Sequence, residues 1–246
     1  MILIIGSHQD DILYCSSLLN KKTQETLLGR FPAQRGTIFN QEVLLVSGVH
    51  TSLLSASLTA YLLSQHYVSL IIVMGKCYSL AHSFKPGQII VSKEIIDIDV
   101  DQIDVANASL AQVPGMPTVY RVQNDLLGYL NDGFSRRTLT SATQVTLLCS
   151  DNLYSPAVEK AMAQKRVLGS GGPFVIDSVS YGAAVSGLLR DVPVISVKAV
   201  ERDLSDHKTI EGYVGALDTY VDMGKAVVYL IGDIGRSDIL RVRRGQ

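Results

Sequence analysis

The stretch VSLIIVMGKCYSLAHSFKPGQIIVS, residues Val68–Ser92, decides the fold that this sequence predicts. Its segment Ser69–Met74 is a short run of mostly β-branched apolar residues ended by Gly75, as expected of a strand buried on both faces of a parallel sheet. The small and polar residues Lys76–Ser83 predict a loop at the carboxyl end of that strand, where open α/β sheets bind ligands. A new strand is expected from Gln88, and an ordinary connection without a ligand is the alternative.

The composition is that of a globular protein without a strong charge bias. The 246 residues include 47% hydrophobic and 18% charged residues, with a formal net charge of −1. This length suits one large α/β domain or two small ones, and the sequence has no linker or composition shift, so we expect a single domain over residues 1–246. The near-neutral charge disfavours nucleic acid and anionic membrane as partners. No apolar run reaches the ~20 residues of a membrane span.

The cysteines predict a reducing compartment rather than a disulfide framework. Cys15, Cys77 and Cys149 are far apart, odd in number and without CxxC spacing, which also argues against a structural zinc site. Cys77 lies in the loop predicted after Met74, so it is either a reactive thiol or a buried bystander. The chain runs from Met1 directly into an apolar strand without a basic leader, so we expect a soluble, cytoplasmic protein.

Strands alternate with helices along the chain, which is the pattern of an α/β fold with a largely parallel or mixed sheet. The expected strands are 1–5, 26–31, 36–39, 43–47, 69–74, 88–100, 144–148, 174–176 and 192–200, with a hairpin over 36–47. The expected helices are 9–19, 51–66, 125–130, 156–164, 178–189 and 209–231, and a long loop is expected over 101–117. Ser7 is the expected N-cap of the first helix, with Asp10 and Asp11 in its first turn, where negative charge suits the helix dipole.

Polar loops follow four of the predicted strands, those ending near residues 5, 74, 148 and 200. In a largely parallel sheet such loops meet at one edge, where α/β proteins bind ligands. The acids available there are Asp11, Asp151, Asp177, Glu201 and Asp203. Paired carboxylates at such an edge can protonate a leaving group and activate water, which is the chemistry of glycoside cleavage. The competing interpretation is that each acid caps a helix.

Motifs for other chemistries are absent from the sequence. It contains no GxGxxG, GxxxxGK[ST], HExxH or GxSxG pattern. The five histidines, His8, His50, His66, His82 and His207, show no metal-ligand spacing. We therefore expect neither a metal ion nor a bound cofactor.

A series of short motifs runs along nearly the whole chain. They are Ile4–Asp11, Val46–Val49, Gly75 with Leu80, Lys85–Ser92, Asp97–Val100, Val113–Pro117, Ser150–Asp151, Val192–Pro193 and Lys198–Val200. In this order they resemble the opening strand with its acids and the SGIG, GSAGGL, DADV, LPGCP, GDAF and VPF…RAIS elements of the 5′-methylthioadenosine/S-adenosylhomocysteine nucleosidases, within the purine nucleoside phosphorylase superfamily. The resemblance implies a three-layer sandwich with a mixed central sheet flanked by helices.

The resemblance also implies a reaction, the hydrolysis of the bond between a purine and ribose. In the family the base leaves protonated at N7 while the sugar becomes oxocarbenium-like, so binding favours a positive sugar and a neutral base. Asp11 stands where the family glutamate orients water. Asp203, or less favoured Glu201, stands where the family aspartate serves the base. The loop containing Leu153 and Tyr154 is then expected against the purine face.

The sequence departs from the family pattern at the ribose and after the central strand. The MEA segment, whose glutamate grips the ribose hydroxyls, falls on Ser178–Ser180, and Val179 cannot accept those hydrogen bonds. Bulky Lys76 and Tyr78 replace small residues that let backbone approach the ligand, and Lys76 either binds an anionic group or is solvated. The RAISD element has a one-residue insertion within 198–203. The residues expected to bind substrate are Gly75, Lys76, Tyr78, Leu153, Tyr154, Asp177, Ser178 and Val179.

These observations leave three hypotheses. The first is an N-ribosyl hydrolase, or a nucleoside phosphorylase, with altered substrate preference, in which Asp11 and Asp203 are catalytic. The second is a family member that has lost hydrolysis and binds or senses a nucleoside-like ligand, motivated by Val179. The third is a purely structural protein. The resemblance also implies a homodimer in which the 101–117 loop lies near the partner's pocket.

Overall fold

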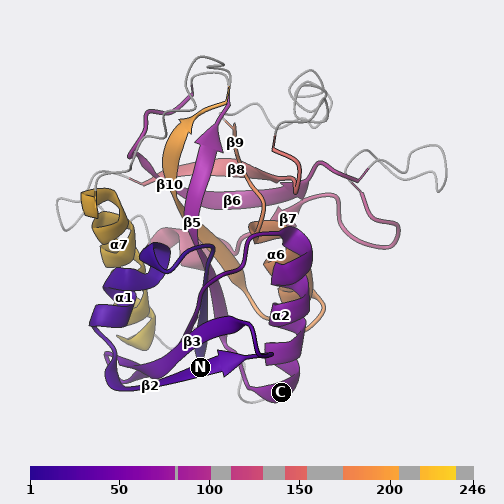
Figure 1. Ribbon diagram of the computed structural model, residues 1–246. Helices are drawn as coiled ribbons and strands as arrows, with labels where there is room; N and C mark the ends of the chain where they lie inside the picture. The colour runs from indigo at the N-terminus through magenta and orange to yellow at the C-terminus, as the bar shows by residue number, and fades with distance from the viewer. Residues whose placement is uncertain (81–82, 101–111, 130–141, 154–173, 205–216, 237–246) are drawn as a thin grey trace.

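The computed structural model describes residues 1–80, 83–100, 112–129, 142–153, 174–204 and 217–236 (Figure 1). Its strands are β1 Ile2–Gly6, β2 Asn20–Leu27, β3 Phe31–Ile38, β4 Gln41–Val46, β5 Leu70–Ser79, β6 Ile89–Asp97, β7 Tyr120–Arg121, β8 Thr143–Cys149, β9 Phe174–Asp177 and β10 Val194–Asp203. Its helices are α1 Leu13–Ser17, α2 Ser52–Gln65, α6 Ser180–Leu188 and α7 Leu217–Arg236, with a 3-10 turn at Asp10–Ile12 and a further helical segment at 124–129.

The strand predicted after residue 68 is β5, and it lies at the middle of a mixed ten-stranded sheet. Leu70–Met74 is buried on both faces and pairs in parallel with β1 on one side and β10 on the other, which confirms the prediction. The loop expected from Lys76 is wrong, because β5 continues through Gly75 to Ser79. Residues 76–79 stay in the sheet because they pair with β10 and, from Tyr78, with β9.

The sheet closes on itself at one end. β10 pairs with both β5 and β6, and the path from β6 through β8 and β9 leads back to β5. Figure 1 shows β6 and β8 lying across the upper part of β5 and β10. β9 runs antiparallel to β5 with Ile176 opposite Tyr78, so the last residue of β9, Asp177, returns to the level of Cys77. The closure of the sheet therefore brings the ends of β5, β9 and β10 close together.

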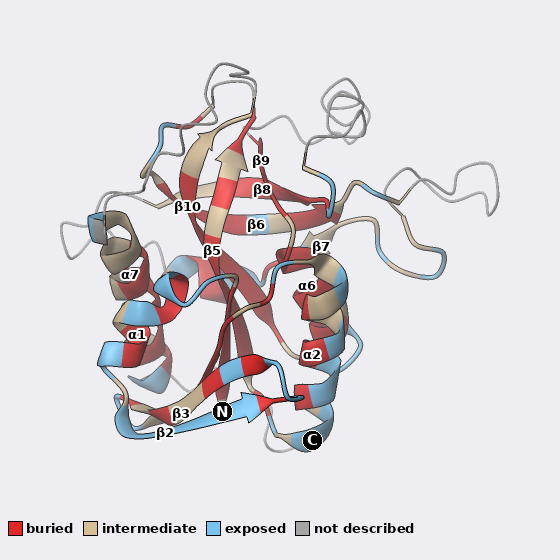
Figure 2. Cartoon of the chain, viewed as in Figure 1, coloured by how far each residue is buried: buried red, intermediate tan, exposed pale blue. Residues whose placement is uncertain are grey.

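Helices cover both faces of the sheet, as the α/β prediction requires. α1 and α7 lie on one face and α2 and α6 on the other (Figures 1 and 2). Alternate residues of β1 separate the two cores: Ile4 packs toward α1 and α7, whereas Ile5 packs toward α2 and α6. This alternation is the period-2 geometry of a strand covered on both sides. The mixed sheet flanked by helices is thus confirmed.

The N-terminal elements differ from the sequence predictions. The hairpin is longer than expected, because β3 and β4 join at Phe39 and Asn40, whose φ values of 48° and 63° form the two-residue turn that suits twisted strands. The helix expected over 9–19 is broken into the 3-10 turn and α1. Ser7 is not its N-cap: the turn begins after Gln9 without a side-chain cap. The break turns Asp11 inward, where it is 1% exposed.

The strand expected over 26–31 is wrong, because residues 28–30 form the turn that joins β2 to β3, and most other boundaries moved by a few residues. Thr51 caps α2 by accepting the Leu54 N–H at 3.2 Å, so that helix is confirmed, although Leu53 is 72% exposed rather than on the buried face. β10 extends to Asp203, which removes the first part of the loop expected over 201–208. The helix expected over 156–164 and most of the 101–117 loop lie outside the described residues. Among the helices of the described ranges, none is long and apolar enough to cross a membrane.

Candidate active site

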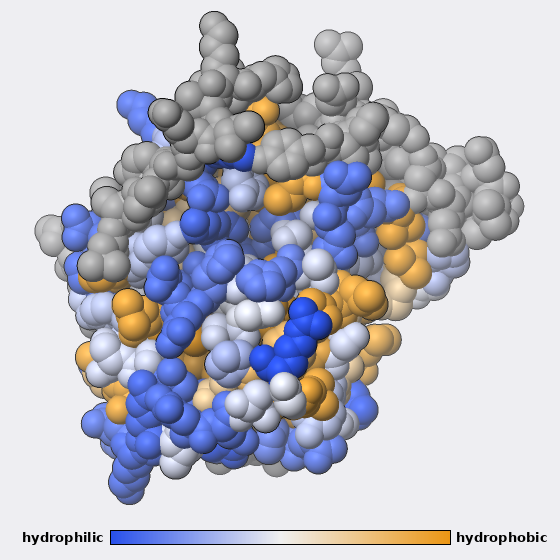
Figure 3. Space-filling model, in the orientation of Figure 1, coloured by the Kyte–Doolittle hydropathy of each residue, from blue (hydrophilic) through white to orange (hydrophobic). Residues whose placement is uncertain are grey.

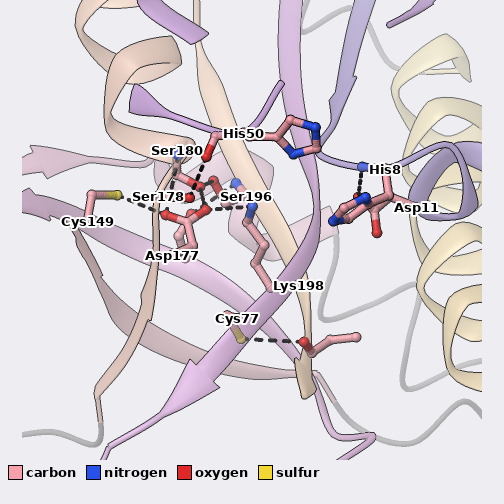
Figure 4. A network of polar contacts seen from close by, with 12 residues as sticks. His8, Asp11, His50, Cys77, Cys149, Asp177, Ser178, Ser180, Ser196 and Lys198 are labelled. Carbon is pink, nitrogen blue, oxygen red and sulfur yellow. Dashed lines mark hydrogen bonds and ion pairs between the residues drawn. The ribbon is translucent and has the colours of Figure 1, made fainter. Parts of the chain in front are cut away.

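A cavity of about 300 Å³ lies where β1, β4, β5, β9 and β10 end. It is lined by Ser7, His8, His50, Lys76, Tyr78, Leu153, Asp177, Ser178, Val179 and Glu201. Figure 3 shows hydrophilic side chains gathered over the middle of the viewed face, and Figure 4 shows several of the polar residues from close by. The closure of the sheet makes this convergence possible, because it brings the ends of sequence-distant strands together.

Most residues expected to bind substrate lie at this cavity. The structure places six of the eight in its lining: Lys76, Tyr78, Leu153, Asp177, Ser178 and Val179. Gly75 precedes Lys76 on β5 and contacts the carboxylate of Asp11, whereas Tyr154 lies outside the described residues. Their roles toward a ligand remain predictions.

Asp11 is a buried carboxylate directly beneath the lining residue His8. Its Oδ2 accepts the His8 backbone N–H at 2.7 Å, and its Oδ1 has no hydrogen-bond partner among the described residues. Burial raises the pKa of Asp11 above its usual value, although the His8 N–H and the charges of Lys198 and Lys76 oppose the shift. An unsatisfied oxygen on a buried acid is costly to the fold, which makes it a candidate for chemistry.

Gly75 is required beside Asp11 on two grounds. Its φ of +140° is a conformation that L side chains rarely adopt, and a Cβ there would lie 3.0 Å from Asp11 Oδ2. We predict that Gly75→Ala lowers stability by about 1–3 kcal/mol and displaces the carboxylate. Urea denaturation and the activity assay described below measure the two effects, and Gly29→Ala is a control at another positive φ with open space around it. Equal stability losses in the two variants would contradict the contact with Asp11.

The two acids expected to serve the base are placed differently. Glu201 lines the cavity, whereas Asp203 is not among the lining residues and pairs with Ser79 at the end of β5. The register between β10 and β5 shifts between Val200 and Arg202, so Glu201 is the extra residue of a β-bulge. The one-residue insertion within 198–203, relative to the RAISD element of the family pattern, coincides with this bulge. Bulges re-aim a side chain, and here the one that reaches the cavity is Glu201.

Glu201 is held by an ion pair with Lys76. Lys76 Nζ lies 2.8 Å from Glu201 Oε1, and these side chains are 31% and 16% exposed. The ammonium also lies 5.9 Å from the centroid of the Tyr220 ring, which belongs to α7. Burial alone would lower the pKa of Lys76, but its bonds to Glu201 and Tyr220 raise that pKa well above the usual value. The cavity therefore contains a fixed cation beside a carboxylate.

Asp177 forms a second ion pair, and this one is fully buried (Figure 4). Its Oδ2 lies 2.6 Å from Lys198 Nζ and accepts the Ser180 hydroxyl at 2.6 Å. Its Oδ1 accepts the Cys149 thiol at 3.0 Å and the Ser180 N–H at 3.3 Å. Burial would raise the pKa of Asp177, but the charge of Lys198 and these hydrogen bonds lower it. Both oxygens of the Asp177 carboxylate are therefore occupied by contacts within the protein, including those to the first turn of α6.

Two histidines, His8 and His50, line the cavity, although the spacing of the histidines in the sequence indicates no metal site. The ring centroids of His8 and His50 are 5.0 Å apart, and Ser178 Oγ donates to the His50 carbonyl at 2.8 Å. Burial and the proximity of His8 and Arg30 lower the pKa of His50, which favours a neutral ring at neutral pH. Each histidine follows a strand end, β1 or β4, and this position was the signal that could have identified them.

The described residues hold no group of three or more His, Cys, Asp or Glu side chains arranged to bind a metal ion. The charges at the cavity are instead arranged in pairs. Lys76 is paired with Glu201 and Lys198 with Asp177, whereas no ion pair within 4 Å involves Asp11 in the part of the chain described. Among the described residues, the Asp11 carboxylate is therefore left without a paired ammonium, which suits a ligand group that becomes positive near it.

The sequence of the chain is similar to those of known proteins. A family model described as the phosphorylase superfamily matches residues 2–216. The 5′-methylthioadenosine/S-adenosylhomocysteine nucleosidases of Bacillus thuringiensis (strain Al Hakam) and Bacillus cereus (strain B4264) are each 26% identical to the chain over 126 residues. That match covers 51% of this chain and 54% of each relative, so it spans about half the length of the curated relatives.

Solved structures share the fold at low identity. The nucleosidase of Neisseria meningitidis, in complex with methylthio-immucillin-A, matches with a TM-score of 0.80 at 17% identity, covering 94% of this chain and 98% of that one. The S-adenosylhomocysteine nucleosidase of Streptococcus pyogenes, in complex with 5-methylthiotubericidin, gives 0.81 at 16% identity over 95% and 96%. The futalosine hydrolase of Helicobacter pylori strain 26695 gives 0.79 at 13% identity over 94% and 97%.

Proposed function

The chain belongs to the phosphorylase superfamily, and from this membership we propose that it is an N-ribosyl hydrolase acting on a purine nucleoside or a related compound, with an altered substrate preference. The observation that carries the proposal is the unpaired Oδ1 of Asp11, buried beneath the cavity. The relatives named as nucleosidases and futalosine hydrolase support the reaction class.

The proposed reaction separates charge, and the cavity is arranged for it. As the bond from the sugar to the base breaks, the sugar becomes positive, and the uncompensated carboxylate of Asp11 stabilises that charge. Asp11 then accepts a proton from the water that attacks the sugar carbon. Its raised pKa makes it a better base than an exposed aspartate. Leu153, Tyr78 and Val179 supply the apolar wall against which a purine ring packs.

On the base side the proposal uses Glu201 rather than Asp203. Glu201 lines the cavity and is held by Lys76, whereas Asp203 is not part of the lining. On the ribose side no direct replacement for the family glutamate is proposed. Val179 cannot accept hydrogen bonds, and Asp177 already receives Lys198, Cys149 and Ser180. These losses support a ligand other than the relatives' substrates.

The same losses favour one second candidate function. A cavity that keeps an apolar wall but lacks the ribose-gripping carboxylate suits a protein that binds a nucleoside-like ligand without turning it over. In this candidate the buried Asp11 recognises a donor on the ligand rather than activating water. A thermal-shift screen of nucleosides that finds a stabilising compound without release of its base would favour this function over the first.

Release of free base from a panel of nucleosides tests the proposal. The panel is adenosine, inosine, guanosine, 5′-methylthioadenosine and S-adenosylhomocysteine, each with and without inorganic phosphate, followed by chromatography of the base and the sugar. We expect release of base and free sugar independent of phosphate. Formation of a sugar 1-phosphate only when phosphate is present would make the protein a phosphorylase. No base release from any compound would exclude the hydrolase.

We further propose that the protein is a homodimer and that it works in a reducing, cytoplasmic compartment. The sequence Ser52–Gln65 of α2 has no charged residue, yet Leu53 and Tyr61 are 72% and 39% exposed. An uncharged helix face is compatible with a second copy of itself across a two-fold axis. The described cysteines Cys15, Cys77 and Cys149 are free and buried, which supports a reducing compartment. Light scattering coupled to size exclusion measures the oligomeric state, and a monomer would exclude the dimer.

A further inference from the structure

The described part of the cavity contains no carboxylic acid that is free to protonate a leaving base. Asp177 is fully buried and ion-paired, and its oxygens accept from Ser180 and Cys149. Glu201 is already engaged, because its Oε1 lies 2.8 Å from the ammonium of Lys76. Asp11, beneath the lining residue His8, is the group proposed to accept the proton of the attacking water, so it is not also the acid for the base. A proton for the base is therefore not supplied by these groups.

Lys76 is the cationic group that the cavity offers in place of an acid. It lines the cavity from β5, on the same strand face as Tyr78, with Cys77 buried on the opposite face. Glu201 holds its ammonium at 2.8 Å and the Tyr220 ring lies 5.9 Å away, so the cation is positioned before a ligand binds. Such a pre-positioned charge stabilises developing charge more strongly than water does, because it does not have to reorganise.

We propose that Lys76 stabilises the departing base as an anion, so that the substrate is a nucleoside whose base is acidic enough to leave without prior protonation. The inference rests on the proposed hydrolase function. The bond between the sugar carbon and the base nitrogen breaks, and its electron pair stays on the base nitrogen. The water oxygen bonds to the sugar carbon, and its proton goes to Asp11. The base anion, paired with Lys76, takes a proton from solvent after release, and Asp11 returns its proton to solvent.

The two charges are matched to the two ends of the breaking bond. A Cβ at Gly75 would lie 3.0 Å from Asp11 Oδ2, and Lys76 is the next residue on β5, so an anion and a cation lie near each other along this strand. In this proposal Asp11 stabilises the sugar that becomes positive, and Lys76 stabilises the base that becomes negative. A neutral small residue in place of Lys76 would leave the base end without this stabilisation.

The Lys76→Met variant tests the proposal on turnover. Its rate is expected to fall by about 10²–10³-fold at pH 8, the loss typical of one pre-positioned electrostatic group. Lys225→Met is the matched control, because Lys225 is 34% exposed and bonded to Asp222 at 2.9 Å outside the cavity. Equal rates in the two variants would overturn the proposal.

The acidity of the leaving base gives a second measure of the same step. Ribosides of adenine, 2,6-dichloropurine and 8-azaadenine, in order of increasing acidity of the free base, should be cleaved progressively faster by the wild type. A rate that does not depend on base acidity, with an alkaline fall typical of a titrating proton donor, would overturn the proposal. Glu201→Gln should keep the dependence on acidity, because it keeps the cation.

Binding of the free bases separates this inference from the proposed function. The wild type should bind 8-azaadenine at least 10-fold more tightly where the base is ionised than where it is neutral, as measured by calorimetry across pH. Lys76→Met should lose this preference, and Lys225→Met should keep it. If no nucleoside is cleaved but the preference is present, the hydrolase function fails and the recognition of an anionic base by Lys76 stands. If cleavage occurs without the preference, the inference on Lys76 fails alone.

Discussion

Asp11→Asn is expected to reduce base release by about 10²–10⁴-fold, the contribution typical of a general base, and at the same time to raise the melting temperature. The amide cannot accept a proton from water. It also removes a carboxylate that is 1% exposed and whose Oδ1 has no described partner, so the folded state no longer bears the cost of burying that charge. A melting temperature higher by about 2–4 °C corresponds to each kcal/mol gained in a chain of this size.

The pH dependence of this gain follows from the direction of the Asp11 pKa shift. Burial raises the pKa in the folded state above its unfolded value, so the folded state binds the proton more tightly than the unfolded chain does. Wild-type stability is therefore penalised above the folded pKa, and the penalty disappears as the pH falls toward the ordinary aspartate value. The melting temperature of Asp11→Asn minus that of the wild type should be greatest near neutrality and shrink on acidification.

Wild-type turnover should fall over the same acidic range, because protonated Asp11 accepts no proton from water. Asp10→Asn is the matched control for both readouts, since Asp10 is its exposed neighbour in the same 3-10 turn. That control should leave turnover and its pH profile unchanged. A destabilised Asp11→Asn variant that still releases base at the wild-type rate would refute the role of Asp11 as the general base.

Lys198→Met is expected to destabilise the fold by about 3–5 kcal/mol, the cost of leaving one partner of a buried ion pair alone. Lys198 is 0% exposed and Asp177 3% exposed, so the unpaired Asp177 is only slightly accessible to water. The corresponding fall in melting temperature is about 6–20 °C. Urea denaturation and calorimetry measure the change.

Removing both charges should restore much of this loss. In Lys198→Met/Asp177→Leu no charge remains buried, although the bonds from Ser180 and Cys149 to Asp177 are also lost. We therefore expect the double variant to be more stable than Lys198→Met alone. Lys225→Met, which removes a partly exposed pair, should change stability by less than about 1 kcal/mol. A double variant as unstable as the single one would show that packing, not charge, governs the site.

Local patterning in the sequence was enough to predict the α/β class and most of the elements. The β-branched run ended by Gly75 predicted β5, and Thr51 marked the start of α2. Both are signals carried by neighbouring residues, a run typical of a buried strand in one case and a helical apolar pattern in the other. The order of short motifs along the chain also identified the cavity residues Lys76, Tyr78 and Val179. These predictions needed no knowledge of which strands pair.

Strand pairing decided the rest of the site. The sequence predicted Asp177 at the site but not its ion pair, because only the antiparallel pairing of β9 with β5 and the register of β10 bring it against Lys198. Glu201 displaced Asp203 at the cavity because a bulge in β10 re-aims one side chain, and a bulge depends on the partner strand. Contacts between residues far apart in the chain are set by the closed sheet, so their chemistry appears only once the strands are assembled.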